Sequence, residues 1–296
     1  MPINWRYWGA YPVITAEFEA AVQLAFSEDD GATVSIVNTS NLSSGYSNWN
    51  PAAGDGIHFL TVDEQTQKLF CWSDSSNDVF STDFDGSNEA FITDQAAVIT
   101  SGMGIDVDED YIYLGDDGTQ IVRYDKDGSN GTTLTGDNDF DFSLRTCIPN
   151  GHLYAVQNGT AVRRCNLDGS SATTVVNTPG GGNRAIDIDD INEYFFVIKT
   201  TSTTSYLIRY DLDGSNATGL VGFPDSFDYL GTQVRGISID IFSEEIYTSR
   251  RGTGSSGNSL SRWQYDGTRL DTNDYTNTLC CDLVFPEGSL QAKPNR

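Results

Sequence analysis

Short runs of alternating apolar and polar residues, separated by turn residues, recur along most of the chain. In one stretch, Tyr111-Ile-Tyr-Leu114 is followed by a loop, by Ile121-Val-Arg-Tyr124 and by the turn Asp125-Lys-Asp-Gly-Ser-Asn130. Alternation with a period of two places successive side chains on opposite faces, which predicts β-strands rather than helices. We therefore expect an all-β chain built from hairpins.

This unit repeats five times. The glycines of its turns are Gly86, Gly128, Gly169, Gly214 and Gly267, with spacings of 42, 41, 45 and 53 residues. Upstream of each turn, two further runs recur, an apolar run that contains or ends near an aspartate and then an aromatic run. Four antiparallel strands in roughly 40 to 45 residues are typical of a β-propeller blade.

The repeats predict a single propeller domain over residues 21–296. Five blades are expected at approximately 57–94, 101–136, 144–177, 183–222 and 234–273, and a sixth is split between 21–47 and 279–290. Pairing of the N- and C-terminal segments would close the ring and remove its free strand edges. Residues 12–18 could supply the missing inner strand instead of 279–285, and the sequence leaves both alternatives open.

Two of the repeats resemble a known family. Ile121-Val-Arg-Tyr-Asp-Lys-Asp-Gly-Ser-Asn130 and Leu207-Ile-Arg-Tyr-Asp-Leu-Asp-Gly-Ser-Asn216 resemble the YWTD repeat, or class B repeat, of propellers of the low-density-lipoprotein-receptor type. The signature itself is nearest to Cys71-Trp-Ser-Asp74. The resemblance implies a six-bladed β-propeller, and shared blade geometry does not carry function with it.

Composition and charge narrow the classes of partner. The chain has 32 Asp but only 10 Glu, and 13 Arg but only 4 Lys, with a formal net charge of −25. Few Glu and Lys indicate few exposed helices. The negative charge argues against nucleic acid and anionic membrane surfaces as partners.

No apolar run is long enough to span a membrane and no secretory signal is visible. Five cysteines without a C-x-x-C spacing predict buried free thiols.

The aspartates give two metal hypotheses. The turns are similar to the start of a calcium loop but lack its late bidentate acid, so we expect type I or bulged hairpin turns there. One acid also lies on or at the end of each of five inner strands, and a ring of carboxylates around a channel could bind a cation such as Ca²⁺ and support lactone or ester hydrolysis. These acids are Asp63, Asp106, Asp187, Asp240 and Asp282, of which Asp106, Asp187 and Asp240 are the candidate ligands. The alternative is that each carboxylate joins strand ends or neighbouring blades.

Aromatic residues outside the strands are the candidate binding residues. Large aromatic side chains on loops favour contacts with proteins or carbohydrates. In the N-terminal extension, residues 1–20, they could dock a neighbouring molecule or pack on the sixth blade. The candidates are Trp5, Tyr7, Trp8, Tyr11, Tyr46, Trp49, Phe140, Phe142, Phe223, Phe227 and Tyr229.

These observations favour a non-enzymatic interaction or structural protein that binds a protein or glycan through its loop face. The acidic composition resembles that of extracellular proteins, yet no secretory signal is visible. Together these features predict an exposed component of a virion, as a capsid decoration or tail protein, or of another extracellular particle. No cofactor is expected. The alternatives are a metal-dependent propeller hydrolase of the lactonase type and a secreted or cell-surface recognition module.

Overall fold

The computed structural model describes residues 23–28, 33–40, 42, 47–49, 57–73, 78–94, 102–116, 120–135, 143–157, 161–177, 182–200, 205–222, 233–241, 243–251, 259–274 and 278–284. These residues form six four-stranded antiparallel sheets. Apart from one 3₁₀ turn, η1 (Ile148–Asn150), the regular elements among them are strands. The expectation of an all-β chain of hairpins is therefore confirmed.

Five sheets are continuous in sequence, and each consists of four consecutive strands. They are β4 (Ile57–Asp63), β5 (Lys68–Ser73), β6 (Asp78–Asp83) and β7 (Ala90–Asp94); β8 (Gly102–Val107), β9 (Tyr111–Asp116), β10 (Ile121–Asp125) and β11 (Thr132–Thr135); β12 (Leu144–Cys147), β13 (His152–Gln157), β14 (Ala161–Asn166) and β15 (Thr173–Asn177); β16 (Gly182–Asp189), β17 (Tyr194–Thr200), β18 (Ser205–Asp211) and β19 (Thr218–Gly222); and β20 (Gln233–Asp240), β21 (Glu245–Arg251), β22 (Ser259–Gln264) and β23 (Arg269–Asp274).

The sixth sheet joins the two ends of the described chain. It is antiparallel like the others, and we call it the mixed sheet because its strands come from both ends of the chain. Its order is β24 (Thr278–Val284), β1 (Gln23–Glu28), β2 (Val34–Asn38) and β3 (Ser47–Trp49). Strand β24 pairs antiparallel with β1 from Gln23↔Val284 to Glu28↔Thr278, with a bulge in between. The C-terminal strand therefore supplies the inner strand of this sheet, and residues 12–18 lie outside the described part.

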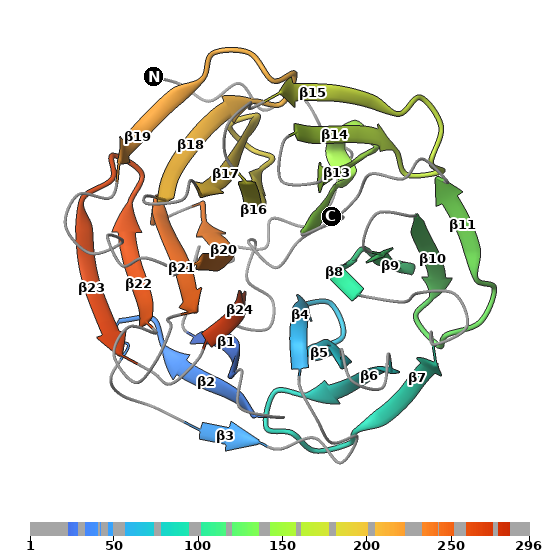
Figure 1. Cartoon of the computed structure of the whole chain (residues 1–296). Helices are drawn as coiled ribbons and strands as arrows, with labels where there is room; N and C mark the ends of the chain where they lie inside the picture. The colour runs from blue at the N-terminus through green and yellow to red at the C-terminus, as the bar shows by residue number, and fades with distance from the viewer. Residues whose placement is uncertain are drawn as a thin grey trace, which may run out of the picture.

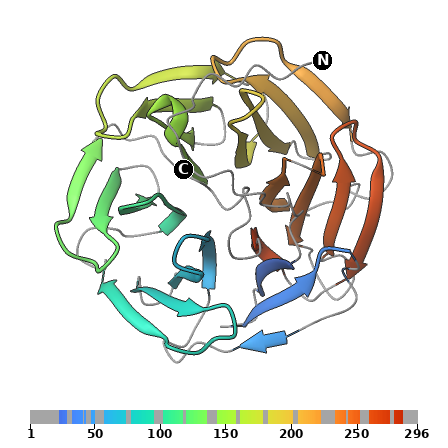
Figure 2. The ribbon, with the colours of Figure 1, turned by 180° about the vertical axis from the view of Figure 1, so that it is seen from behind.

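The sheets stand side by side around a common axis, which is the arrangement of a β-propeller (Figure 1, and from behind in Figure 2). The first strand of each sheet lies nearest the axis and the fourth lies on the rim. Each inner strand also contacts the inner strands of both neighbouring sheets, including β24 with β4 and with β20.

The apolar core lies between neighbouring sheets rather than within any one of them. Between the β4 and β8 sheets, for example, Phe70 and Trp72 of β5 are packed with Ile105 and Val107 of β8. A strand whose two faces both meet a neighbouring sheet is buried on both faces, which explains why β5 and β13 carry nearly continuous buried runs. Cys71, Cys147, Cys165 and Cys281 are buried and free, so the expectation of buried thiols is confirmed for these four.

The alternating strand directions give the propeller two distinct ends. The turns between first and second strands and between third and fourth strands leave one end, which we call the turn face. The connections between second and third strands, and from each rim strand to the next inner strand, leave the other end, which we call the loop face. The turn face is largely described, whereas most of the loop-face connections fall outside the described residues. No helix among the described residues is long and apolar enough to cross a membrane.

Candidate functional site

A set of buried polar side chains lies where the inner strands approach the axis. These residues share one register position, opposite the third residue of the second strand: Thr61 faces Phe70, Asp106 faces Tyr113, Arg145 faces Tyr154, Asp187 faces Phe196 and Ser238 faces Tyr247. All five are buried. We call this the central position. Buried polar groups must be satisfied by partners, so the contacts made here determine what the site can do.

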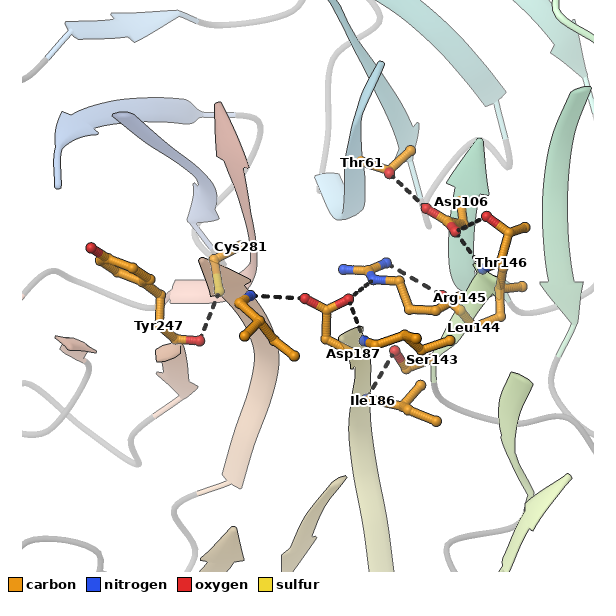
Figure 3. A network of polar contacts seen from close by, with 12 residues as sticks. Thr61, Asp106, Ser143, Leu144, Arg145, Thr146, Ile186, Asp187, Tyr247 and Cys281 are labelled. Carbon is orange, nitrogen blue, oxygen red and sulfur yellow. Dashed lines mark hydrogen bonds and ion pairs between the residues drawn. The ribbon is translucent and has the colours of Figure 1, made fainter. Parts of the chain in front are cut away.

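Asp106 joins three inner strands. Its carboxylate accepts a hydrogen bond from Thr61 Oγ1 on β4 (3.1 Å) and two bonds from Thr146 on β12, one from the backbone nitrogen (2.7 Å) and one from Oγ1 (2.8 Å). Figure 3 shows the aspartate between these two threonines. Because the donors come from the preceding and the following sheet, this carboxylate holds three neighbouring sheets together.

Asp187 on β16, two sheets further along the chain, also accepts hydrogen bonds from the preceding and the following sheet. It accepts hydrogen bonds from Arg145 Nε on β12 (3.1 Å), from the backbone nitrogen of Ile239 on β20 (2.8 Å) and from the backbone nitrogen of Ile188 on its own strand (2.9 Å) (Figure 3). Arg145 and Asp187 form an ion pair whose side chains are only 7% and 2% exposed. Charge-assisted bonds in such a buried place are strong but depend on both partners.

The inner-strand acids do not all occupy one level. Asp63 and Asp240 lie two residues beyond the central position, opposite Lys68 and Glu245 at the strand ends. Asp240 there accepts a bond from the backbone nitrogen of Ser243 (3.2 Å) in the following turn. The spacing of the aspartates along the sequence suggested one equivalent position in each repeat, whereas they occupy two different positions in the strand register. The described residues contain no group of three or more His, Cys, Asp or Glu side chains placed to hold a metal ion. The candidate trio of Asp106, Asp187 and Asp240 is thus not brought together at one level.

Two carboxylates at the strand ends contact the next sheet. Asp63 accepts a bond from Lys126 Nζ (2.7 Å), and Asp189 accepts one from Tyr265 Oη (3.2 Å). Burial raises the pKa of Asp189 above its usual value, although bonds from Asn192 and Tyr265 oppose the shift. Burial also raises the pKa of Tyr265, and the nearby Asp189 carboxylate adds to the effect. Lys126 and Tyr265 occupy the same position in their turns. In two sheet pairs, the residue at this position therefore donates to a strand-end carboxylate of the preceding sheet.

The aspartate-glycine turns are bulged hairpins, as expected. In each described copy the glycine nitrogen donates to the carbonyl three residues earlier, as Gly128 does to Asp125 (2.8 Å), and the glycine φ is positive. The carboxylates bind donors of their own turn, for example Asp127 Oδ1 from the nitrogen of Ser129 (2.9 Å) and Asp125 Oδ2 from Nδ2 of Asn130 (2.7 Å). The bonds from Ser129 lower the pKa of Asp127. These contacts favour the turn interpretation over the calcium one.

The turns also contact the preceding sheet. A Cβ atom at Gly128 would lie 2.1 Å from the carbonyl oxygen of Ile92 on β7, and one at Gly169 would lie 2.1 Å from that of Leu134 on β11. At Gly214 the corresponding distance, to Val175 on β15, is 2.0 Å. Glycine is thus required at this position for two reasons, the positive φ and the rim strand beside it.

Sequence reasoning missed a row of arginines on the third strands. Arg123 Nη1 donates to the carbonyl of Leu167 (3.3 Å), Arg164 Nη1 to that of Leu212 (3.4 Å) and Arg262 Nη1 to that of Thr39 (2.8 Å). Each acceptor lies in the third-to-fourth-strand turn of the next sheet, and Thr39 shows that the mixed sheet receives the same contact. A signal was present, because an arginine stands at the matching place in four repeats, at 123, 164, 209 and 262.

One turn departs from the consensus at two positions together, and this gives a testable prediction. Asn166 and Ser171 stand where three other turns have Asp and Asn, and Ser171 keeps the positive φ (57°) that favours Asn. Restoring the Asp–Asn bond with Asn166→Asp and Ser171→Asn together should raise the free energy of unfolding by about 1 kcal/mol. Urea denaturation measures this change. The converse pair, Asp211→Asn with Asn216→Ser, is the control and should lower stability by a similar amount. Equal stability of both double variants and the parent would contradict the prediction.

Most of the candidate binding aromatics lie outside the described residues. This applies to Trp5, Tyr7, Trp8, Tyr11, Tyr46, Phe140, Phe142, Phe223, Phe227 and Tyr229. Trp49 is the last residue of β3, and its side chain is not described. The described strands nevertheless fix where several of these segments attach. Residues 136–142 continue from β11 and residues 223–232 from β19, so both leave rim strands at the loop face.

Comparison with known proteins supports the fold. No protein-family model matches the chain, and no curated protein matches it. Among solved structures, it is similar to one from a nidogen/laminin complex, with a TM-score of 0.74 and 14% identity over 89% of this chain and 98% of that one. TolB from Acinetobacter baumannii has a TM-score of 0.67 and 13% identity, over 89% of this chain and 67% of that one. Hydrazine synthase from Kuenenia stuttgartiensis has a TM-score of 0.58 and 13% identity, over 83% of this chain and 74% of that one. At such identities the likeness shows the propeller fold alone.

Proposed function

We propose that the protein is a non-enzymatic interaction module, a closed six-bladed propeller that binds a protein partner through its loop face. One observation carries this proposal. The buried polar side chains nearest the axis, Asp106, Arg145 and Asp187, have donors and acceptors on neighbouring inner strands, so their geometry serves to join sheets. A hydrolytic site would need groups that converge on a substrate.

The contacts of the mixed sheet support a closed ring. Strand β24 is bonded to β1 and contacts β4 and β20, and Arg262 reaches the turn of the mixed sheet at Thr39. We infer that the mixed sheet is the sixth blade. The ring would then be a rigid support for the strands that the loop-face segments connect, as in other proteins whose binding residues lie on loops held by a scaffold.

The neighbours bear on the class of partner. One structural neighbour comes from a complex of nidogen with laminin, which is a complex between proteins. Another is hydrazine synthase, so the same fold also occurs in an enzyme. The net charge of −25 favours a partner with a neutral or cationic surface over polyanions. A glycan partner and a location on a virion or other particle remain predictions from the sequence.

A photo-crosslinking experiment tests the proposal. A crosslinking amino acid would be placed at Phe140 or Phe227 for the loop face, and at Asp85 or Asp213 for the turn face, where both aspartates are exposed. The full chain would be crosslinked in its native source. We expect protein adducts from the loop-face positions only. Adducts confined to the turn face, or none from either face, would overturn the proposal.

An activity measurement addresses the hydrolase alternative. The chain would be assayed against lactones and aryl esters with added Ca²⁺ and with a chelator, in parallel with Asp106→Asn. Our proposal predicts no turnover that depends on the metal. Turnover that the chelator removes, and that Asp106→Asn lowers without unfolding the chain, would support the hydrolase instead.

A further inference from the structure

We propose that Asn130 is a site of spontaneous deamidation, exposed at the turn face and controlled by its hydrogen bond to Asp125. The turn between β10 and β11 ends in the dipeptide Asn130-Gly131. Asn130 is exposed, has φ 54° and donates from Nδ2 to Asp125 Oδ2 over 2.7 Å. An asparagine followed by glycine is the most reactive pair for this chemistry, because no side chain shields the glycine nitrogen.

The fold keeps this reactive pair in place. Asparagine suits the left-handed backbone at 130. Glycine suits position 131 because an added Cβ would lie 2.3 Å from Cε1 of the buried Tyr124 ring. Both residues are therefore constrained by the structure of the turn, although neither is needed for a catalytic site.

The reaction needs only water. The backbone nitrogen of Gly131 attacks Cγ of Asn130 and loses its proton, and the Nδ2 group leaves as ammonia, which forms a cyclic imide. Water then opens the imide at either carbonyl, giving aspartate or isoaspartate at position 130. The net change is loss of ammonia and gain of water, so the mass rises by roughly one dalton.

A matched turn within the same chain lacks the glycine. Asn216 has φ 52°, is exposed, and donates from Nδ2 to Asp211 Oδ2 over the same 2.7 Å. It is followed by Ala217, whose methyl group shields the backbone nitrogen. The two turns thus differ mainly in the residue that supplies the attacking nitrogen.

The bond to Asp125 sets the rate in the folded protein. Nδ2 must leave Asp125 before the side chain can turn toward the nitrogen of Gly131, so modification requires a local opening of the turn. Once formed, a carboxylate at 130 would face the Asp125 carboxylate, and like charges at this distance repel. The same turn carries Lys126, which binds Asp63 of the preceding sheet. Deamidation would therefore loosen the contact between the β4 and β8 sheets.

Peptide mass spectrometry with ¹⁸O-water tests the proposal. The full chain would be incubated folded at mildly alkaline pH, and incorporation at Asn130 and Asn216 would be followed over weeks by fragment ions. We expect modification at Asn130 to be at least about tenfold faster than at Asn216. In Asp125→Ala the rate at Asn130 should rise several-fold, while the rate at Asn216 should stay unchanged.

Two further variants keep the test decisive. Asp125→Asn has a natural precedent in Asn166 of the next turn, so it should fold even where the alanine variant does not, and it should give an intermediate rate at Asn130. Ala217→Gly should raise the rate at Asn216 toward that at Asn130. Equal rates at the two asparagines in the parent chain, or no effect of either Asp125 variant, would overturn the proposal.

Discussion

Replacing Gly169 with alanine should destabilise the protein by about 2 to 4 kcal/mol, the cost of a steric clash with the neighbouring rim strand added to an unfavourable backbone conformation. The new Cβ would lie 2.1 Å from the oxygen and 2.5 Å from the carbon of the Leu134 carbonyl, and the φ of +82° disfavours any L side chain. The rim strand β11 would have to move away from the turn. Urea unfolding followed by tryptophan fluorescence measures the loss.

Two control glycines distinguish the cost of the steric clash from the cost of a positive φ at a residue with a side chain. Gly151 also has a positive φ (+69°), but nothing lies within 4 Å of the place that a new methyl group would take, so Gly151→Ala should cost only about 1 kcal/mol. Gly219 has open space and no positive φ, and Gly219→Ala should change stability by less than about 0.5 kcal/mol. If Gly169→Ala costs no more than Gly151→Ala, the close approach of turn and rim strand is not a significant constraint.

Breaking the buried ion pair at the centre should have an effect of similar size. Arg145→Met leaves the Asp187 carboxylate buried without its cation, and we expect a loss of about 3 to 5 kcal/mol. Asp187→Asn keeps an oxygen that can accept from Ile239 but removes the charge, and should cost less. The double variant should be more stable than the sum of the single losses predicts, with a coupling energy of about 1 to 3 kcal/mol.

The control for this cycle is an ion pair near the surface. Lys68 Nζ and Asp83 Oδ1 lie 2.8 Å apart, with side chains 31% and 35% exposed. Lys68→Met should cost less than about 1 kcal/mol because water already screens the pair. Additive losses in the central cycle would show that Arg145 and Asp187 stabilise the propeller independently of each other.

The repeat was readable from the sequence because it is local. The Asp-x-Asp-Gly turns, the alternation in the strands that flank them and their spacing follow from the backbone requirements of a hairpin, so four-stranded antiparallel sheets in a propeller could be predicted. Gly128 illustrates this, since its positive φ is a property of the turn itself.

Contacts between sheets were harder to predict because they depend on register. A shift of two residues separates the central Asp106 from the strand-end Asp63, and the spacing of acids along the chain does not reveal it. The arginine row was visible as a repeat, but its acceptors are carbonyls of the next sheet, 44, 48 and 223 residues away in the chain. A carbonyl has no sequence signature. The candidate aromatics on the loop face lie in segments whose lengths differ between repeats, where periodicity gives no information.

The pairing of β24 with β1 has a consequence for how the protein is made. Strands β1 and β2 leave the ribosome before the five continuous sheets, yet the inner strand that completes their sheet spans Thr278–Val284 and is synthesised after all five. During translation the five continuous sheets can form in turn. The hairpin of β1 and β2 has an unpaired edge at β1 until β24 has been synthesised. Such a long-range final step is slow and exposes an aggregation-prone edge. Cellular yield should therefore depend on the speed with which β24 pairs with β1 and on chaperones that shield β1 until it does.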